Sequence, residues 1–291
     1  METVIHIGGR FVAPGADLDE RVVSLLDHGY LLGDGVFATM RGYRGVCFRA
    51  ERHLRDLRRG AELFGIELPT TPSALVEVAN ESARRTGAED AYVRVTLTRG
   101  RPGGPPTLSV IARRMELPSD ADYANGVSVV TVGPRRIPPA CLDGSVKTTS
   151  YGVQVLARRE AEAKKAREGI MLAIDGTLAC GTMANLFVVV GDTLLTPSLE
   201  SGCRAGITRG AVLELASSQF AHVREERLST SVLEHADEVF LTSTRIECLP
   251  VADVDGQPVG RGRATANGRR FARTQALREA FTALVAAETA A

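Results

Sequence analysis

Between residues 50 and 65 the apolar positions recur every three or four residues, and arginines occupy most of the other faces. The apolar positions are Leu54, Leu57, Ala61 and Phe64. This spacing predicts an amphipathic helix. A similar pattern predicts a second helix over residues 73–87, beginning at Ser73 after Pro72 and ending at Gly87.

Around these two helices the pattern changes to that of strands. Residues 91–100 and 107–114 predict an antiparallel pair joined by the loop RPGGPP, and two further strands are expected on either side of Tyr43-Arg44-Gly45. The segment METVIHIGGRFV predicts a short strand and a Gly-Gly turn. Together these elements form an α+β unit of the size of one domain.

The polar segment MELPSDADYANG has no periodicity and is the predicted domain boundary. We therefore expect an N-terminal domain over residues 1–116, a connector over 117–125 and a C-terminal α/β domain over 126–291. The expected elements of the second domain are a strand at 127–133, a helix at 151–169, strands joined by turns at Asp175-Gly176 and Gly191-Asp192, a helix at 206–220, a strand within 223–245 and a C-terminal helix from 276.

Composition limits the classes of function. Apolar residues make up 44% of the chain and charged residues 24%, and 35 basic residues balance 35 acidic ones. The chain has no signal-peptide pattern and no long apolar run, so the expectation is a cytoplasmic protein that acts on a small molecule rather than on nucleic acid or a membrane. Five cysteines without a C-x-x-C pair predict buried thiols. His28 and His53 lack companions at metal-ligand spacing, so no metal is proposed.

The stretch GSVKTTSYG places a single lysine, Lys147, among small and hydroxylated residues. A lone lysine is usually a solvated charge. Two other segments change that interpretation, because both could hold an anion. Gly206-Ile207-Thr208 opens a predicted helix, where free backbone N–H groups favour phosphate, and Thr242-Ser243-Thr244 ends a predicted strand with three hydroxyls. Together they suggest a phosphorylated ligand held near an amine.

Six segments, in chain order, resemble motifs of the class IV pyridoxal-phosphate enzymes, the family of branched-chain and D-amino acid aminotransferases and aminodeoxychorismate lyases. The segments are LLDHGYLLGDGVFATMR, RHLRDL, SVKTTSY, DGTLACGTMANLFVV, GITRGAVLELA and ADEVFLTSTRIECLPV. The resemblance covers almost the full chain and implies a two-domain α/β (α+β) fold of the class IV aminotransferase type and a homodimer. By resemblance, Lys147 is the Schiff-base lysine and proton shuttle, and Ile207, Thr208, Ser243 and Thr244 hold the phosphate.

Two positions depart from the family pattern. The glutamate that pairs with the cofactor's pyridine nitrogen corresponds to Cys180, four residues after Gly176. A thiol has an ordinary pKa of about 8.5 and cannot keep that nitrogen protonated. The phosphate-binding arginine corresponds to Asp56, although Arg52 and Arg59 share its helix face and could replace the missing charge.

Phe37 and Arg94 match positions of the family's substrate pocket, although core packing and a surface role remain alternatives for them. Three functions stay open at this point. The first is a pyridoxal-phosphate-dependent aminotransferase or aminodeoxychorismate-lyase-like enzyme acting on a small amino acid or amino-carboxylate. The second is an enzyme that has lost the cofactor and uses Lys147, with Cys180, directly. The third is a non-catalytic binding protein.

Overall fold

The computed structural model describes residues 3–12, 23–262 and 270–290. The chain forms two compact units. Unit 1 comprises residues 1–116, 146–151 and 285–291, and unit 2 comprises residues 117–145 and 152–284. The segment that contains Lys147 therefore belongs to unit 1, whereas the sequence analysis assigned it to the second domain. The backbone of this segment pairs with a strand of unit 1, which explains the difference.

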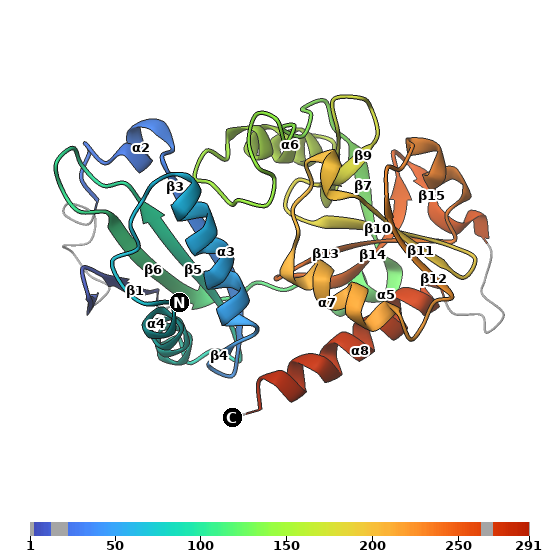
Figure 1. The fold of residues 1–291 in the computed structure, drawn as a ribbon. Coiled ribbons are helices and arrows are strands. Elements are labelled where there is room, and N and C mark those ends of the chain that lie inside the picture. Colours follow the sequence, from blue (N-terminus) through green and yellow to red (C-terminus); the bar gives the residue numbers. More distant parts are fainter. Residues whose placement is uncertain (1–2, 13–22, 263–269, 291) are drawn as a thin grey trace. The chain divides into compact units, whose positions relative to one another are not determined.

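Unit 1 is an antiparallel sheet with helices on one face (Figure 1). Its strand order is β2-β1-β6-β5-β3-β4. The strands are β1 (Val4–Ile7), β2 (Arg10–Val12), β3 (Gly35–Tyr43), β4 (Val46–Cys47), β5 (Asp90–Thr98) and β6 (Thr107–Arg114). The helices are α2 (His28–Leu32), α3 (Ala50–Leu63) and α4 (Pro72–Arg85). Helices α3 and α4 pack against each other and against the sheet, as the two predicted amphipathic patterns require.

Side chains of β5 alternate between the two faces of this sheet. Ala91, Val93, Val95 and Leu97 are buried in the core that α3 and α4 cover. The intervening residues, which include Arg94, point to the opposite face. This face carries Phe37, because Phe37 on β3 is directly opposite Thr96 on β5. Strand alternation thus brings both predicted substrate residues to the face without α3 and α4.

Unit 2 is built around a nine-stranded mixed sheet with the order β12-β11-β10-β13-β14-β7-β8-β9, and β15 pairs with β14. Its strands are β7 (Val127–Thr131), β8 (Glu168–Leu172), β9 (Leu178–Gly181), β10 (Asn185–Val190), β11 (Thr193–Pro197), β12 (His222–Glu226), β13 (Glu238–Ser243), β14 (Glu247–Val254) and β15 (Gln257–Pro258). Its α-helices are α5 (Asp120–Asn125), α6 (Gly152–Ala163), α7 (Ile207–Ala216) and, up to Leu284, α8 (Ala272–Glu288). Short 3-10 helices are η1 (Leu199–Ser201), η2 (Thr230–His235) and η3 (Val259–Gly262).

Apolar clusters cover both faces of this sheet. On β10, Leu186 and Val188 belong to one buried cluster, and Phe187 and Val189 belong to another that includes residues of α7. A strand buried on both faces appears in the sequence as a continuous apolar run, which is why the segment NLFVVV lacks alternation. Within the described residues, no helix is long and apolar enough to cross a membrane.

Several element boundaries differ from the sequence expectation. Helix α4 begins at Pro72, and Thr71 caps it by accepting a hydrogen bond from Ala74 N at 3.2 Å. Helix α6 ends at Ala163 rather than at 169, because β8 begins at Glu168 and pairs with β7. The connector contains α5, which begins with a capping box at Ser119. Each difference reflects a cap or a strand pairing that apolar periodicity does not encode.

Candidate active site

The segment that carries Lys147 lies along β3 in unit 1. Phe37 N donates a hydrogen bond to Lys147 O at 2.8 Å, and Thr149 N donates to Gly35 O at the same distance. The Thr149 hydroxyl also donates to Gly33 O at 2.7 Å. Two backbone bonds and one side-chain bond thus fix the segment at Lys147 and at Thr149, and the neighbouring strand β3 positions the amine.

The Lys147 side chain contacts an aromatic ring that also carries an arginine. Lys147 Nζ lies 5.0 Å from the centroid of the Phe37 ring, and Arg94 Cζ lies 3.7 Å from the same centroid. The Tyr151 ring meets Phe37 edge-on at a centroid distance of 5.5 Å, and Arg94 Nε donates to the Thr96 hydroxyl at 3.0 Å. Unit 1 therefore brings together Lys147, Phe37 and Arg94, which sequence analysis had selected separately.

A second group of selected residues lies in unit 2, at the N-terminus of α7. Gly206 is the N-cap of α7 and no side chain caps the helix. A Cβ at Gly206 would lie 2.2 Å from Asn185 Oδ1, so this position has no room for a side chain. Thr208, in the first turn, is buried. Free N–H groups at the start of a ten-residue helix bind anions such as phosphate.

Thr242 belongs to the hydroxyl run that the sequence analysis selected, although the resemblance assigned only Ser243 and Thr244 to the phosphate. It lies opposite Asn185 in the pairing of β10 with β13, and α7 packs against β13. Its side chain is 1% exposed, and its hydroxyl makes no hydrogen bond to any described residue. A buried hydroxyl without a partner is rare in proteins and is consistent with a missing ligand. Because side chains alternate along a strand, Thr242 and Ser243 point to opposite faces of the sheet. The two-residue period of the strand was therefore the sequence signal that could have distinguished Thr242 from Ser243.

Cys180 is a buried, neutral thiol. It lies on β9 in a small cluster with Ala179 and Cys203. Burial raises the pKa of the Cys180 thiol to about 12, although the charge of Arg136 acts in the opposite direction. A thiol with such a pKa stays protonated near neutral pH and is a poor nucleophile. Cys180 therefore provides no charged group, either to pair with the cofactor's ring nitrogen or to act directly as a nucleophile.

The buried carboxylate closest in sequence to Cys180 serves the backbone instead. Glu168 Oε1 accepts hydrogen bonds from Gly169 N at 2.9 Å and from Thr182 N at 3.1 Å, and also from the Thr182 hydroxyl. These contacts fix the chain as it leaves β9. Glu168 thus stabilises the turn that follows Cys180, and its Oε1 atom is already used as an acceptor.

The other cysteines and the histidines are structural or exposed. Cys47, Cys203 and Cys248 are buried free thiols, whereas Cys141 is exposed, so the expectation of burial is wrong for Cys141. Cys141 follows two prolines in a loop outside the core. His53 is buried in α3, and His28 lies 3.8 Å from Asp34.

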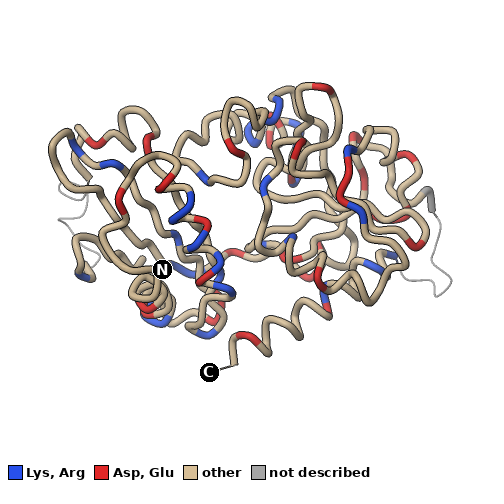
Figure 2. The backbone as a smooth tube through the Cα atoms, viewed as in Figure 1, with Lys and Arg blue, Asp and Glu red and all other residues tan. Residues whose placement is uncertain are grey.

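The arginine-rich helix α3 contains the position of the missing phosphate arginine. Figure 2 shows basic residues along much of this helix. Asp56 is partly buried there, while Arg52 and Arg59 are exposed. All three belong to unit 1. The roles of Asp56, Arg52 and Arg59 towards a phosphate stay predictions.

Unit 1 thus holds the Lys147 amine beside β3, and unit 2 contains the N-terminus of α7 without a side-chain cap. A family profile described as "Amino-transferase class IV" matches residues 35–254. The chain belongs to the class IV aminotransferases. This finding confirms the predicted family and fold class.

Related proteins match nearly the whole chain. A Methanocaldococcus jannaschii protein, provisionally named a branched-chain-amino-acid aminotransferase, is 35% identical over 88% of this chain and 89% of its own length. The D-alanine aminotransferase of Bacillus licheniformis is 29% identical over 84% and 87%. The solved structure of an Escherichia coli branched-chain amino acid aminotransferase has a TM-score of 0.89 and 27% identity, covering 100% of this chain and 97% of that one.

Proposed function

We propose that this enzyme binds pyridoxal phosphate and transfers the amino group of a small amino acid. The observation that carries the proposal is the position of Lys147 alongside β3, next to Phe37. The chain has only three lysines, and the other two, Lys164 and Lys165, are exposed. Lys164 pairs with Glu160 at 2.9 Å on the surface of α6. Lys147 is the lysine with a structured environment suited to covalent attachment of an aldehyde cofactor.

The proposal assigns proton transfer and phosphate binding to particular residues. Bound pyridoxal phosphate would supply an electron sink for a substrate carbon that loses a proton. Lys147 would accept and return that proton at Nζ. The N-terminus of α7, with Thr208 and the hydroxyls of residues 242–244, would hold the phosphate, which would give the Thr242 hydroxyl its missing partner.

The Cys180 position limits the rate that we expect. The residues suit the phosphate and the aldehyde, but a neutral buried thiol does not suit a protonated ring nitrogen. A carboxylate partner would hold that proton by ion pairing, and the thiol has no charge to do so. We therefore propose slow transamination rather than loss of the cofactor.

Arg94 would orient the substrate. Its guanidinium covers the Phe37 ring and is held by the Thr96 hydroxyl, and a planar guanidinium is well shaped for a carboxylate. The relatives are named for branched-chain amino acids and for D-alanine. A small amino acid is the substrate class that these names share.

We also propose that two copies of the chain associate. A continuous segment of unit 1 exposes large apolar side chains: Val23, Leu25, Leu26, Tyr30, Leu31 and Leu32. None of the residues of α2 is buried. An apolar surface of this kind usually contacts another protein, and a second copy is the simplest partner. Sedimentation should show a dimer that Leu26→Asp together with Leu31→Asp converts to a monomer.

A labelling experiment tests the cofactor proposal. The purified protein, incubated with pyridoxal phosphate, is reduced with borohydride and digested, and mass spectrometry locates the phosphopyridoxyl group. We expect the label on the Lys147 peptide, and both exposed lysines serve as internal controls. Label spread equally over the three lysines, or none, would reject the proposal. Loss of native activity in Lys147→Ala without any such label would favour the cofactor-independent enzyme, and unchanged activity would favour a binding protein.

Product analysis separates the two branches of the family. With a small amino acid as donor and a 2-oxo acid as acceptor, transamination gives the amino acid of the acceptor and the oxo acid of the donor. A lyase would form its product without an acceptor. We expect product only when both donor and acceptor are present.

A further inference from the structure

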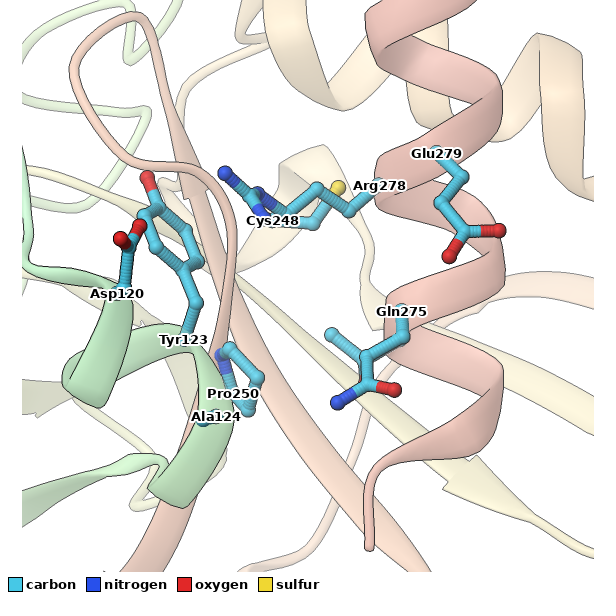
Figure 3. A pocket seen from close by; sticks show the side chains of 9 residues that line it. Asp120, Tyr123, Ala124, Cys248, Pro250, Gln275, Arg278 and Glu279 are labelled. Carbon is cyan, nitrogen blue, oxygen red and sulfur yellow. The ribbon is translucent and has the colours of Figure 1, made fainter. Parts of the chain in front are cut away.

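Unit 2 contains a cavity of about 270 Å³ between α5, β14 and α8, separate from the residues assigned above (Figure 3). Its lining residues are Asp120, Tyr123, Ala124, Cys248, Pro250, Thr274, Gln275, Arg278 and Glu279. Figure 3 shows Arg278 and Gln275 reaching from α8 towards α5, which carries Asp120 and Tyr123. The cavity is large enough for a molecule of the size of an amino acid.

Arg278 is the main recognition group of this cavity. Its Cζ lies 3.6 Å from the centroid of the Tyr123 ring, which holds the guanidinium flat. Arg278 Nε is buried and makes no hydrogen bond to any described residue, although the guanidinium forms an ion pair with the buried Glu247, whose Oε2 lies 3.6 Å from Nε. A planar guanidinium has five N–H donors in a fixed geometry. The Arg278 guanidinium therefore has unused donors that match a carboxylate.

The charges around Arg278 exclude a simple anion as the best ligand. Asp120 and Glu279 both line the cavity and are exposed. Over the part of the chain that the structure describes, neither carboxylate has a hydrogen bond or an ion pair. Asp120 also lies in the first turn of α5, where a negative charge is favourable, but Glu279 is in the middle of α8. With Glu247 paired to Arg278 and two further carboxylates in the lining, the charges favour a ligand that carries an ammonium as well as a carboxylate.

The remaining wall is apolar. Ala124, Cys248 and Pro250 line the cavity between the charged groups. Burial raises the pKa of the Cys248 thiol, so this wall carries no charge near neutral pH. A small aliphatic side chain suits such a surface.

From this arrangement we infer that the cavity binds a free α-amino acid with a small aliphatic side chain. The carboxylate of the ligand would contact Arg278, its ammonium would lie near Asp120, and its side chain would pack on Pro250. Amino acid in this cavity would occupy a second site, apart from Lys147 and Arg94, through which substrate or product concentration could act on the enzyme.

Calorimetry with three small probes tests the inference. The probes are L-valine, isovalerate, which lacks the ammonium, and isobutylamine, which lacks the carboxylate. Binding is measured in the full-length Lys147→Ala variant without added cofactor, so that no reaction occurs. We expect valine to bind at least about tenfold more tightly than either analogue, a difference of about 1.4 kcal/mol, because each analogue lacks one charge-assisted contact.

Substitutions assign the binding to the cavity. Arg278→Met should weaken valine binding by about tenfold or more, whereas Arg159→Met, at an exposed arginine of α6, should have no effect. Asp120→Asn combined with Glu279→Gln should weaken binding of valine but not of isovalerate, and this variant leaves the Arg278–Tyr123 contact in place if Arg278→Met fails to fold. Arg94→Met should leave the Arg278-dependent part of this binding unchanged.

Two outcomes would overturn the inference. One is the absence of valine binding, and the other is valine binding that Arg94→Met abolishes and Arg278→Met leaves intact. The second outcome would place the amino acid at the proposed substrate residues. Because the borohydride label on Lys147 is measured separately, failure here is distinguishable from failure of the cofactor proposal.

Discussion

Lys147 Nζ lies 5.0 Å from the centroid of the Phe37 ring, and the backbone carbonyl of Lys147 accepts a hydrogen bond from Phe37 N. One residue of β3 thus restrains both the backbone and the side chain of Lys147. The same ring carries the Arg94 guanidinium at 3.7 Å. The proposed proton-transferring amine and the proposed carboxylate-binding group are therefore positioned by a single aromatic side chain.

Replacement of Lys147 by alanine should abolish both cofactor labelling and transamination, while the fold remains intact. The side chain is not part of the apolar core, and the backbone bonds to β3 do not depend on it. Activity, borohydride labelling and circular dichroism measure the three properties. Lys164→Ala is the matched control and should behave as the wild type. Undiminished turnover by Lys147→Ala would contradict both enzymatic interpretations.

Introduction of a carboxylate at Cys180 should accelerate transamination and make stability depend on the cofactor. A glutamate there would be buried in the cofactor-free protein, with the charge of Arg136 compensating its own only in part, which we expect to lower the free energy of unfolding by about 1–3 kcal/mol. Bound cofactor would supply the partner and restore stability. Thermal unfolding with and without pyridoxal phosphate measures this difference.

Cys180→Gln, of similar size but uncharged, is the control for Cys180→Glu. It should show neither the rate increase nor the additional stabilisation by the cofactor. Equal behaviour of the two variants would mean that Cys180 does not face the ring nitrogen.

Reversal of the charge at Asp56 should tighten cofactor binding. If Asp56 lies where the family's phosphate arginine lies, Asp56→Arg replaces repulsion by a charge-assisted contact, and an affinity gain of about tenfold or more is expected. Spectroscopic titration with pyridoxal phosphate measures the affinity. Asp56→Asn, which only removes the negative charge, should give an intermediate value. No change in either variant would indicate that Arg52 or Arg59 already provides the charge.

Asp27 should be a major stabilising residue of unit 1. Its carboxylate is fully buried and accepts hydrogen bonds from Gly29 N at 2.7 Å and from the hydroxyls of Thr98 and Thr107 at 2.8 Å each. Asp27→Ala leaves buried donors without a partner and should cost about 3–5 kcal/mol, measured by urea unfolding. Asp122→Ala, which removes only a capping contact at an α-helix, should cost about 1 kcal/mol.

Thiol reagents should modify the native protein at one of its five cysteines. Cys141 is exposed and the other four are buried. Burial raises the pKa of both Cys47 and Cys180 to about 12, so neither forms the reactive thiolate near neutral pH. Titration with a chromogenic disulfide should release one equivalent without denaturant, and Cys141→Ser should abolish this signal. Fast modification of Cys180 would contradict its burial.

Local patterns in the sequence determined much of unit 1. The three-and-four spacing of Leu54 and Leu57 predicted α3, and alternation along AYVRVTLTRG predicted β5 with its two faces. These patterns are informative because the side-chain period of each element is fixed by backbone geometry. The ordered motifs also indicated the family, which the profile match confirms.

Only the tertiary structure decided which of these segments meet. It joined Lys147 to β3 of unit 1, placed the unpartnered Thr242 hydroxyl opposite Asn185, and buried Cys180 beside Cys203. It also formed the cavity between α5 and α8, from residues more than a hundred positions apart. Such contacts depend on strand order and sheet register, and local periodicity carries no information on either. The sequence by itself therefore supplied the chemical groups, and the folded chain supplied the distances between them.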